Sequence, residues 1–577
     1  MRINRLLILM LSFLLIMIGL MARIGYFQLI KGHDIASEAV AMRSKQIELR
    51  EYPRGEILDR NLLPLTSTES SNALYCLPGE IGNAKPKATG SDVNEAESDA
   101  AVMEDLALKL SRALGQDHHE MSKRLNDAGQ NGAAIVRIAE DLSSEQVKII
   151  NAMQLSGIVI APMSKRYRQD GFCSHILGYV SQGAHIEGKA GVEKLYEHIL
   201  KEDPGSQTLN SVIDARGVAI QGLMFKVRQE DDDKRNAIVL TIDKRLQEIV
   251  ESKSRGIKKG AIVLMDVQSK EVLAIASRPT FNPYSDLAYL INNDKQSTLS
   301  NRALSSYHPG SLFKILVAAA ALEEKTVRWD DAFNCTGKFI FNDEVSTSCW
   351  KEEGHGKLDF AHGFAQSCNP VFIETGLKLG RQNLLKYVEK VHLTDERLLG
   401  YSKCSGSYVR INPGEPALGN ACLGQEGVML SPLQMTSLIA TIADDGKYAP
   451  PSLLRYTIDD RGLKQKPAEI SKEQVISQEN ARTVQQLMEL VVSEGTGKTA
   501  ALKEVKVAGK TATSQTGNLK EDGQEILDTW FGGYFPADRP RWAIVIMVEE
   551  GQSGAQDAAP VFKDIAQEML KYFSVSG

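Results

Sequence analysis

A serine placed directly before a long run of helix-forming residues is the feature that most constrains how this 577-residue chain folds. Gly310 precedes Ser311, and the residues from Leu312 to Lys325 include no further Gly or Pro. Such a run predicts a helix that begins at or just before Ser311. At a helix N-terminus, unpaired backbone N–H groups and the positive end of the dipole favour negative charge on the serine oxygen.

A lysine follows this serine after about one helical turn. Lys314 stands three residues after Ser311, so the two side chains share one face of the predicted helix. A buried lysine with a lowered pKa can act as a general base toward a serine hydroxyl. The alternative is an amphipathic helix with a capping serine and a surface lysine. A lone S-x-x-K pattern favours that alternative, because the pattern is common.

Two further polar clusters follow in the chain. Ser367 and Asn369 flank Cys368 just before Pro370, where a helix or loop boundary is expected. A Ser-x-Asn pattern provides a hydroxyl and an amide, but it is also typical of a capping or Asx turn. Residues 507–516 (VAGKTATSQT) predict a strand with one cation and four hydroxyls along which an anionic peptide can lie. The alternative is an edge strand protected by its lysine.

The order Ser-x-x-Lys, Ser-x-Asn and Lys-Thr-x resembles that of the penicillin-recognising serine enzymes. Ser311 and Ser367 are 56 positions apart, and Ser367 and Lys510 are 143 apart, which fits that family. The resemblance extends over nearly the whole chain and is to the class B penicillin-binding proteins. It includes these segments: RGEILDRN at 54–61, HILGYV at 175–180, LTIDKRLQ at 240–247, NRALSSYHPGS at 301–311 and SPLQM at 431–435. The E-D-x-x-F-x-x-H-x-G signature of a glycosyltransferase domain is missing, so the resemblance is not to class A.

This resemblance implies an α/β (α+β) transpeptidase fold, with an antiparallel sheet covered by helices on both faces. An extended mixed pedestal and one N-terminal transmembrane helix are expected before it. We therefore expect four parts: a cytoplasmic N-terminus at 1–5, a transmembrane anchor at 6–22, a non-catalytic pedestal of the penicillin-binding protein dimerisation type at 23–235, and a transpeptidase domain at 236–577.

The anchor is also predicted from the residues themselves. Residues 6–22 (LLILMLSFLLIMIGLMA) carry no charge, although 17 residues is at the short end for a membrane span. Arg2 and Arg5 precede the run, which predicts a cytoplasmic N-terminus and an extracytoplasmic remainder. A cleaved signal peptide is the alternative. Because Arg23 follows directly and no A-x-A site closes the run, we expect an uncleaved anchor in the cytoplasmic membrane.

By resemblance, the reaction is D,D-transpeptidation of peptidoglycan stem peptides that end in D-Ala-D-Ala, with β-lactams acylating the same serine. Ser311 is expected to be the nucleophile and Lys314 the base, although the identity of the base is disputed in this superfamily. Ser367 is expected to relay a proton to the leaving amine, and Asn369 to hold the substrate amide. The reaction needs no cofactor.

The third motif is expected to bind the substrate carboxylate. Lys510 supplies positive potential, Thr511 and Thr513 bind the carboxylate, and the backbone N–H groups of Ser311 and Thr513 form the oxyanion hole. Ala512 stands where the family usually has Gly. Its methyl group is expected to narrow the cleft or displace the strand, which we interpret as tuning rather than inactivation.

The pedestal is expected, again by resemblance, to contact a polytopic membrane glycosyltransferase of the shape, elongation, division or sporulation type. The sequence leaves open which of these processes the protein serves. Two alternatives to a transpeptidase are a catalytically weak scaffold that regulates such a partner, and a β-lactam sensor or β-lactamase. The formal net charge of −6 argues against a nucleic-acid partner.

The cysteines give no clear metal signature. Cys335, Cys349, His355 and His362 lie within one stretch, but no C-x-x-C pair is present there. We therefore expect no metal, and interpret Cys335 and Cys349 as residues that flank a hairpin and can pair in an oxidising compartment. Cys368 is expected to be a small packing residue rather than a nucleophile.

Overall fold

The computed structural model describes the following residues: 2–31, 44–49, 54–67, 69–78, 81, 95–130, 135–155, 157–181, 186–201, 207–212, 226–229, 236–395, 397–402, 408–468 and 471–575. The chain divides into two compact units. One unit contains Met1–Pro53, Thr68–Lys165 and Asp203–Asp233, and the other contains Arg54–Ser67, Arg166–Glu202 and Lys234–Gly577. Residues 54–67 and 166–202 thus group with the second unit, although they precede residue 236, where the transpeptidase domain is expected to begin.

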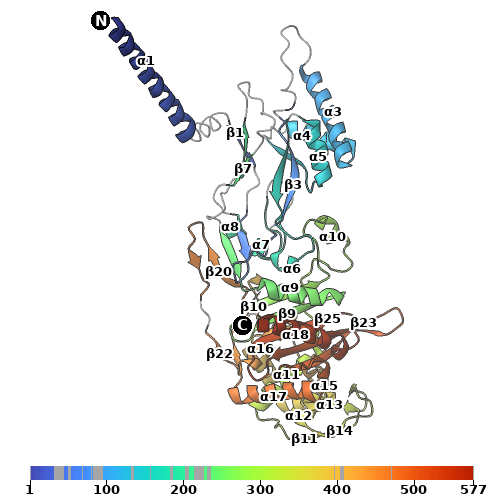
Figure 1. The fold of residues 1–577 in the computed structure, drawn as a ribbon. Helices are drawn as coiled ribbons and strands as arrows, with labels where there is room; N and C mark the ends of the chain where they lie inside the picture. The colour runs from blue at the N-terminus through green and yellow to red at the C-terminus, as the bar shows by residue number, and fades with distance from the viewer. Residues whose placement is uncertain are drawn as a thin grey trace. The chain divides into compact units, whose positions relative to one another are not determined.

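The first element is a long apolar helix (Figure 1). Helix α1 covers Arg2–Gly25 and continues into a π-helical turn, η1, at Tyr26–Ile30. Leu7–Gln28 forms a 22-residue segment with a mean hydropathy of 2.5, and its hydropathic core is not buried against other described parts of the chain. This segment is long and apolar enough to cross a membrane, as predicted, and it extends beyond the 17-residue run recognised in the sequence.

In its described residues, the rest of this unit contains two small sheets and three helices. The first sheet has the strand order β1-β6-β7, with β1 at Ser44–Leu49, β6 at Gln207–Val212 and β7 at Lys226–Gln229. The second has the order β4-β3-β5, with β3 at Ser70–Cys76, β4 at Val136–Ala139 and β5 at Ile158–Ser164. The helices are α3 (Glu95–Leu114), α4 (His118–Gln130) and α5 (Ser144–Met153).

Two interpretations of the sequence in this region are wrong in part. Residues 83–100 (NAKPKATGSDVNEAESDA) are polar and small and include a proline, which predicts a loop, but α3 begins at Glu95, and residues 83–94 lie outside the described residues. Apolar residues at helical spacing predict helix over residues 101–155, but β4 interrupts this segment. Strand β4 is only four residues long, and its pairing with β3 decides its conformation. The sequence window is too short to reveal such tertiary pairing.

The second unit contains a five-stranded antiparallel sheet with the strand order β10-β9-β25-β24-β23. Its strands are β9 (Gly260–Asp266), β10 (Val272–Arg278), β23 (Ala508–Leu519), β24 (Glu525–Phe535) and β25 (Trp542–Val548). Strand β25 lies between β9 and β24, so the sheet joins strands from the start and the end of the transpeptidase domain.

Helices cover both faces of this sheet. Alternate residues of β9 face opposite sides, because successive side chains of a strand point to opposite faces. Ile262 and Leu264 join a core with α9 (Lys244–Lys253) and α18 (Ala559–Val575), and Val263 and Met265 join a second core with α11 (Lys314–Glu323) and α16 (Pro432–Ala443). Figure 1 shows α9 and α11 on opposite sides of β9 and β25. The predicted fold class is confirmed.

A smaller sheet lies beside this domain and has the strand order β2-β8-β20-β21. Its strands are β2 (Glu56–Leu58), β8 (Ala237–Leu240), β20 (Leu454–Ile458) and β21 (Lys464–Gln465). Next to β2, Arg54 is buried and pairs with the fully buried Glu193 at 3.0 Å. The charged signature around residues 54–61 therefore contributes to the packing of this unit.

The second unit also contains further helices and short strands. They include β11 (Ala332–Cys335), β12 (Lys338–Ile340), β13 (Ser346–Ser348), β14 (Gly356–Asp359), α12 (Phe360–Ala365), α13 (Asn369–Leu379), α14 (Arg381–Lys390), α15 (Glu415–Cys422) and α17 (Gln478–Ser493).

Candidate active site

Ser311 lies in a short turn that leads into α11. A 3-10 turn, η5, covers Gly310–Leu312, and α11 begins at Lys314. The α-helix thus starts later than expected, but Ser311 is still at the entrance of the helical segment and is half-buried.

The turn lies against strand β23. Gly310 has a φ of 55°, and its amide donates to the Gly424 carbonyl at 2.9 Å. A Cβ atom on Gly310 would lie 3.1 Å from the Thr513 carbonyl oxygen. Glycine is therefore needed here, both for the left-handed backbone and for the close approach. Because of this approach, the two segments that carry the proposed oxyanion-hole residues, Ser311 and Thr513, lie next to each other.

Lys314 is fully buried and joins the first motif to the second. Its Nζ donates to the Ser367 carbonyl at 2.9 Å, to the Asn369 Oδ1 at 2.9 Å and to the Ser367 Oγ at 3.4 Å. Burial lowers the pKa of Lys314 to about 8, because the interior disfavours the charged ammonium. About a tenth of the amine is then neutral at pH 7, and this neutral form is the one that a general base requires.

The Ser-x-Asn motif forms the connection between α12 and α13. Ser367 is buried and has a φ of 55°, a left-handed conformation that is uncommon for a residue other than glycine. Asn369 is the first residue of α13, and its Nδ2 donates to the Ser348 carbonyl at 3.0 Å. The amide of Asn369 is therefore oriented from both ends, by Ser348 and by Lys314.

The third motif lies on β23, a strand as expected, at the edge of the five-stranded sheet. Lys510 is fully buried, and its pKa lies well below the usual value because of burial first and the charge of Lys314 second. Thr511 is buried and its hydroxyl lies 2.6 Å from that of Thr496. Thr513 is exposed, and its Oγ1 accepts from the Gly554 amide at 3.4 Å.

Ala512 does not disturb the strand. The pairing of β23 with β24 runs without a bulge from Ala508 to Gln515, and Ala512 pairs with Trp530. Its side chain is 3% exposed and belongs to the main core. The methyl group is therefore accommodated on the buried face of β23, where the pairing with β24 is regular.

Sequence reasoning missed several contributors to the site. Thr496 falls in the segment Gly495–Thr499, which resembles half a phosphate loop; the contact with Thr511 gives this segment a place beside the third motif. Gly424 and Ser348 contribute only backbone carbonyls, and carbonyls leave no signal in a sequence. Cys335 and Cys349 flank the β12–β13 hairpin as expected, but both are free thiols rather than a disulfide.

Comparison with known proteins identifies the family. A family model described as "Penicillin binding protein transpeptidase domain" matches residues 260–567, which is more than half of the chain, and one described as "Penicillin-binding Protein dimerisation domain" matches residues 50–228. The chain belongs to the class B penicillin-binding proteins. It is a transpeptidase of the type that includes FtsI and stage V sporulation protein D.

The relatives cover nearly the whole chain. Stage V sporulation protein D of Bacillus subtilis (strain 168) is 30% identical over 99% of this chain and 86% of its own length. The peptidoglycan D,D-transpeptidase FtsI of Escherichia coli (strain K12) is 26% identical over 97% of this chain and 90% of its own length. A crystal structure of penicillin-binding protein 3 from Mycobacterium tuberculosis has a TM-score of 0.61 at 22% identity, covering 92% of this chain and 98% of that one. The last comparison supports the fold.

Proposed function

We propose that this protein is a serine D,D-transpeptidase that cross-links peptidoglycan stem peptides through an acyl-enzyme on Ser311. The observation that carries the proposal is the position of Lys314. Its buried amine, three residues after Ser311, contacts both Ser367 and Asn369. A lysine with a lowered pKa, three residues after a candidate nucleophile and in contact with a candidate proton relay, suits acyl transfer.

In the acylation step, the Ser311 Oγ attacks the carbonyl carbon of the penultimate D-Ala residue. Lys314 takes the hydroxyl proton, and Ser367 passes its own proton to the nitrogen of the terminal D-Ala as the peptide bond breaks, and takes the proton from Lys314 in return. Free D-Ala leaves, and an ester to Ser311 remains. The backbone N–H groups of Ser311 and Thr513 stabilise the oxyanion. A β-lactam acylates Ser311 in the same way, and its opened ring remains attached.

In the transfer step, an amine of a neighbouring stem peptide attacks this ester. A new amide bond forms, the ester bond breaks, and Ser311 recovers its proton. Asn369 holds the amide of the donor peptide, while Thr511, Thr513 and Lys510 bind its terminal carboxylate before acylation. Ala512 lies on β23 between Thr511 and Thr513.

Labelling with a fluorescent penicillin tests the proposal. The full-length protein in detergent is expected to form a covalent adduct that peptide mapping places on Ser311, and Ser311→Ala is expected to form none. Equal labelling of Ser311→Ala, or a label on another residue, would refute the assignment. A folded wild-type protein that is never labelled would favour the catalytically weak scaffold.

We also propose that α1 is an uncleaved single-pass anchor and that both compact units lie outside the cytoplasmic membrane. Arg2 and Arg5 before the apolar segment support this orientation. N-terminal sequencing of the membrane-bound protein is expected to begin at or near Met1, whereas a new terminus near residue 23 would indicate a signal peptide.

A membrane glycosyltransferase is the proposed partner of the dimerisation-type domain. Co-purification from crosslinked membranes, with and without residues 68–165, tests that contact.

A further inference from the structure

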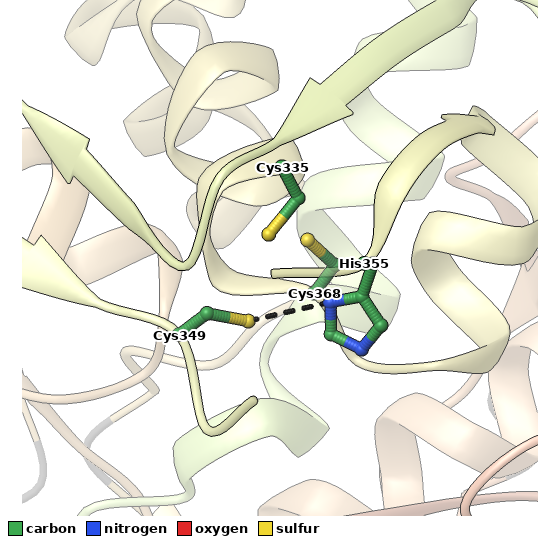
Figure 2. Close-up of side chains that lie close together, drawn as sticks. All are labelled: Cys335, Cys349, His355 and Cys368. Carbon is green, nitrogen blue, oxygen red and sulfur yellow. Dashed lines mark hydrogen bonds between the residues drawn. The ribbon is translucent and has the colours of Figure 1, made fainter. Parts of the chain in front are cut away.

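Three cysteines and a histidine from separate segments converge beside the Ser-x-Asn motif (Figure 2). Cys335 ends β11, Cys349 follows β13, His355 precedes β14, and Cys368 caps the N-terminus of α13. One potential ligand atom from each residue lies within 4.8 Å of all the others. In Figure 2 the three sulfur atoms and one ring nitrogen of His355 face a common point.

The spacing of these atoms fits a metal ion better than a disulfide. The Cys349 Sγ lies 3.5 Å from the His355 Nδ1. In a tetrahedral zinc site with Zn–S about 2.3 Å and Zn–N about 2.05 Å, the S···N separation is about 3.6 Å. A disulfide requires an S–S distance of about 2.05 Å, and the three cysteines are free thiols.

The environment of the cluster also favours an ion. Cys335, Cys349 and Cys368 are at most 3% exposed. His355 is half-buried, and its Nε2 has no hydrogen-bond partner in the described part of the chain. In the described part of the chain, the imidazole ring makes its polar contact through Nδ1, with the Cys349 thiol. A thiol is only a weak hydrogen-bond partner. Four soft or borderline donors around one buried point are the donors that Zn²⁺ prefers.

We propose that Cys335, Cys349, His355 and Cys368 bind one Zn²⁺ ion as a closed structural site. Four protein ligands fill a tetrahedral coordination sphere, so no position is left for water or substrate. The site is therefore suited to holding segments together and not to hydrolysis. The absence of a C-x-x-C pair hid it from the sequence, because each of the four ligands comes from a different segment.

The ion would hold the second catalytic motif in place. Cys368 stands between Ser367 and Asn369, and both of these neighbours contact Lys314. The Asn369 amide already binds the carbonyl of Ser348, the residue before Cys349. A Cys349–Zn–Cys368 link would add a second connection between the same two segments. The four ligands are thus positioning residues. This consequence rests on the proposed function, whereas the metal site itself does not.

Metal content tests the proposal directly. The full-length protein is purified in detergent without chelators or a metal-affinity tag, and zinc is measured by mass spectrometry. The wild type is expected to hold about one zinc ion per chain. Cys335→Ser and Cys349→Ser are expected to lose zinc to a chelator at least about tenfold more readily, because each lacks one of four ligands. Cys422→Ser is the matched control, since Cys422 is a buried free cysteine outside the cluster.

Cobalt substitution of the wild type provides a measurement that needs no variant. Reduced, metal-free protein with added Co²⁺ is expected to show thiolate-to-cobalt charge transfer and the intense visible bands of tetrahedral coordination. Removing zinc is expected to slow acylation by a fluorescent penicillin, and adding Zn²⁺ is expected to restore it.

Three results would overturn the proposal. They are a reduced wild-type protein that takes up neither ion, cysteine variants that retain zinc as the wild type does, and a native disulfide between two of the three cysteines in the peptide map. If the wild type binds zinc but is never acylated, the metal site stands and the proposed function fails.

Discussion

The Lys314 Nζ lies 2.9 Å from the Asn369 Oδ1, although 55 positions separate the two residues in the chain. This contact joins the start of α11 to the start of α13. It also places a buried amine where its pKa is lowered, so one interaction sets both the geometry and the chemistry of the site.

Acylation is expected to depend on the ionisation of Lys314. Burial lowers the pKa of this amine to about 8, and only the neutral form can accept the Ser311 proton. Well below this pKa, the acylation rate should rise about tenfold per pH unit, and above it the rate should level off. Stopped-flow acylation by a β-lactam measures the acylation rate as a function of pH. The Lys314→Met variant should lose acylation. A rate that does not change with pH would show that Lys314 is not the base.

Ala512→Gly is expected to weaken the fold more than it alters catalysis. The variant loses a buried methyl group, about 0.8 kcal/mol, and gains about 0.5–1 kcal/mol of backbone entropy cost in the strand. The acylation rate should change less than about threefold, or under about 0.7 kcal/mol in the barrier, because the strand is already in regular register. Denaturant unfolding and stopped-flow acylation check the two parts. An acylation rate more than about tenfold faster would mean that the methyl group does restrict the cleft.

Asp528→Asn is expected to stabilise the protein more at pH 8 than at pH 5. Burial first, and the charge of Glu549 second, raise the pKa of Asp528 to about 7. Between the unfolded value of 3.8 and this folded value, the native state binds the extra proton, so stability falls as pH rises. The full cost of burying the ionised Asp528 carboxylate is present above about pH 7. The side chain of the Asp528→Asn variant is neutral and avoids this cost. Thermal unfolding of both proteins at the two pH values measures this. An equal shift at both would contradict the raised pKa.

Arg54→Met is expected to destabilise the second unit strongly. Arg54 pairs with the fully buried Glu193 and with Glu197, and breaking a buried pair costs about 3 kcal/mol or more. Arg60→Met is the matched control, because its pair with Glu271 at 3.0 Å is partly exposed and should contribute less than about 1 kcal/mol. Denaturant midpoints of the two variants give the comparison. If both variants lose the same free energy of unfolding, burial does not make the Arg54 pair more stabilising than the partly exposed Arg60 pair.

Local structure in this protein follows closely from local sequence. The sequence of segment 244–253 is helical in pattern, and the segment forms α9 at Lys244–Lys253, where the Asp243 side chain accepts from the Arg245 and Leu246 amides at the helix start. The apolar run at 542–548 (WAIVIMV) is typical of a strand and forms β25. Capping and hydrophobic periodicity act over a few residues, so a sequence window contains all the information they need.

The convergence of distant segments was decided by tertiary packing. The resemblance to penicillin-recognising enzymes placed Lys314 and Asn369 in one site, but only the folded chain shows the lysine bonded to the motif on both sides of Cys368. The cluster of Cys335, Cys349, His355 and Cys368 was passed over because no two of its members have the spacing of a paired metal motif. Ligands that come from a hairpin, a loop and a helix start meet only when those elements pack, and packing depends on contacts between residues far apart in the chain.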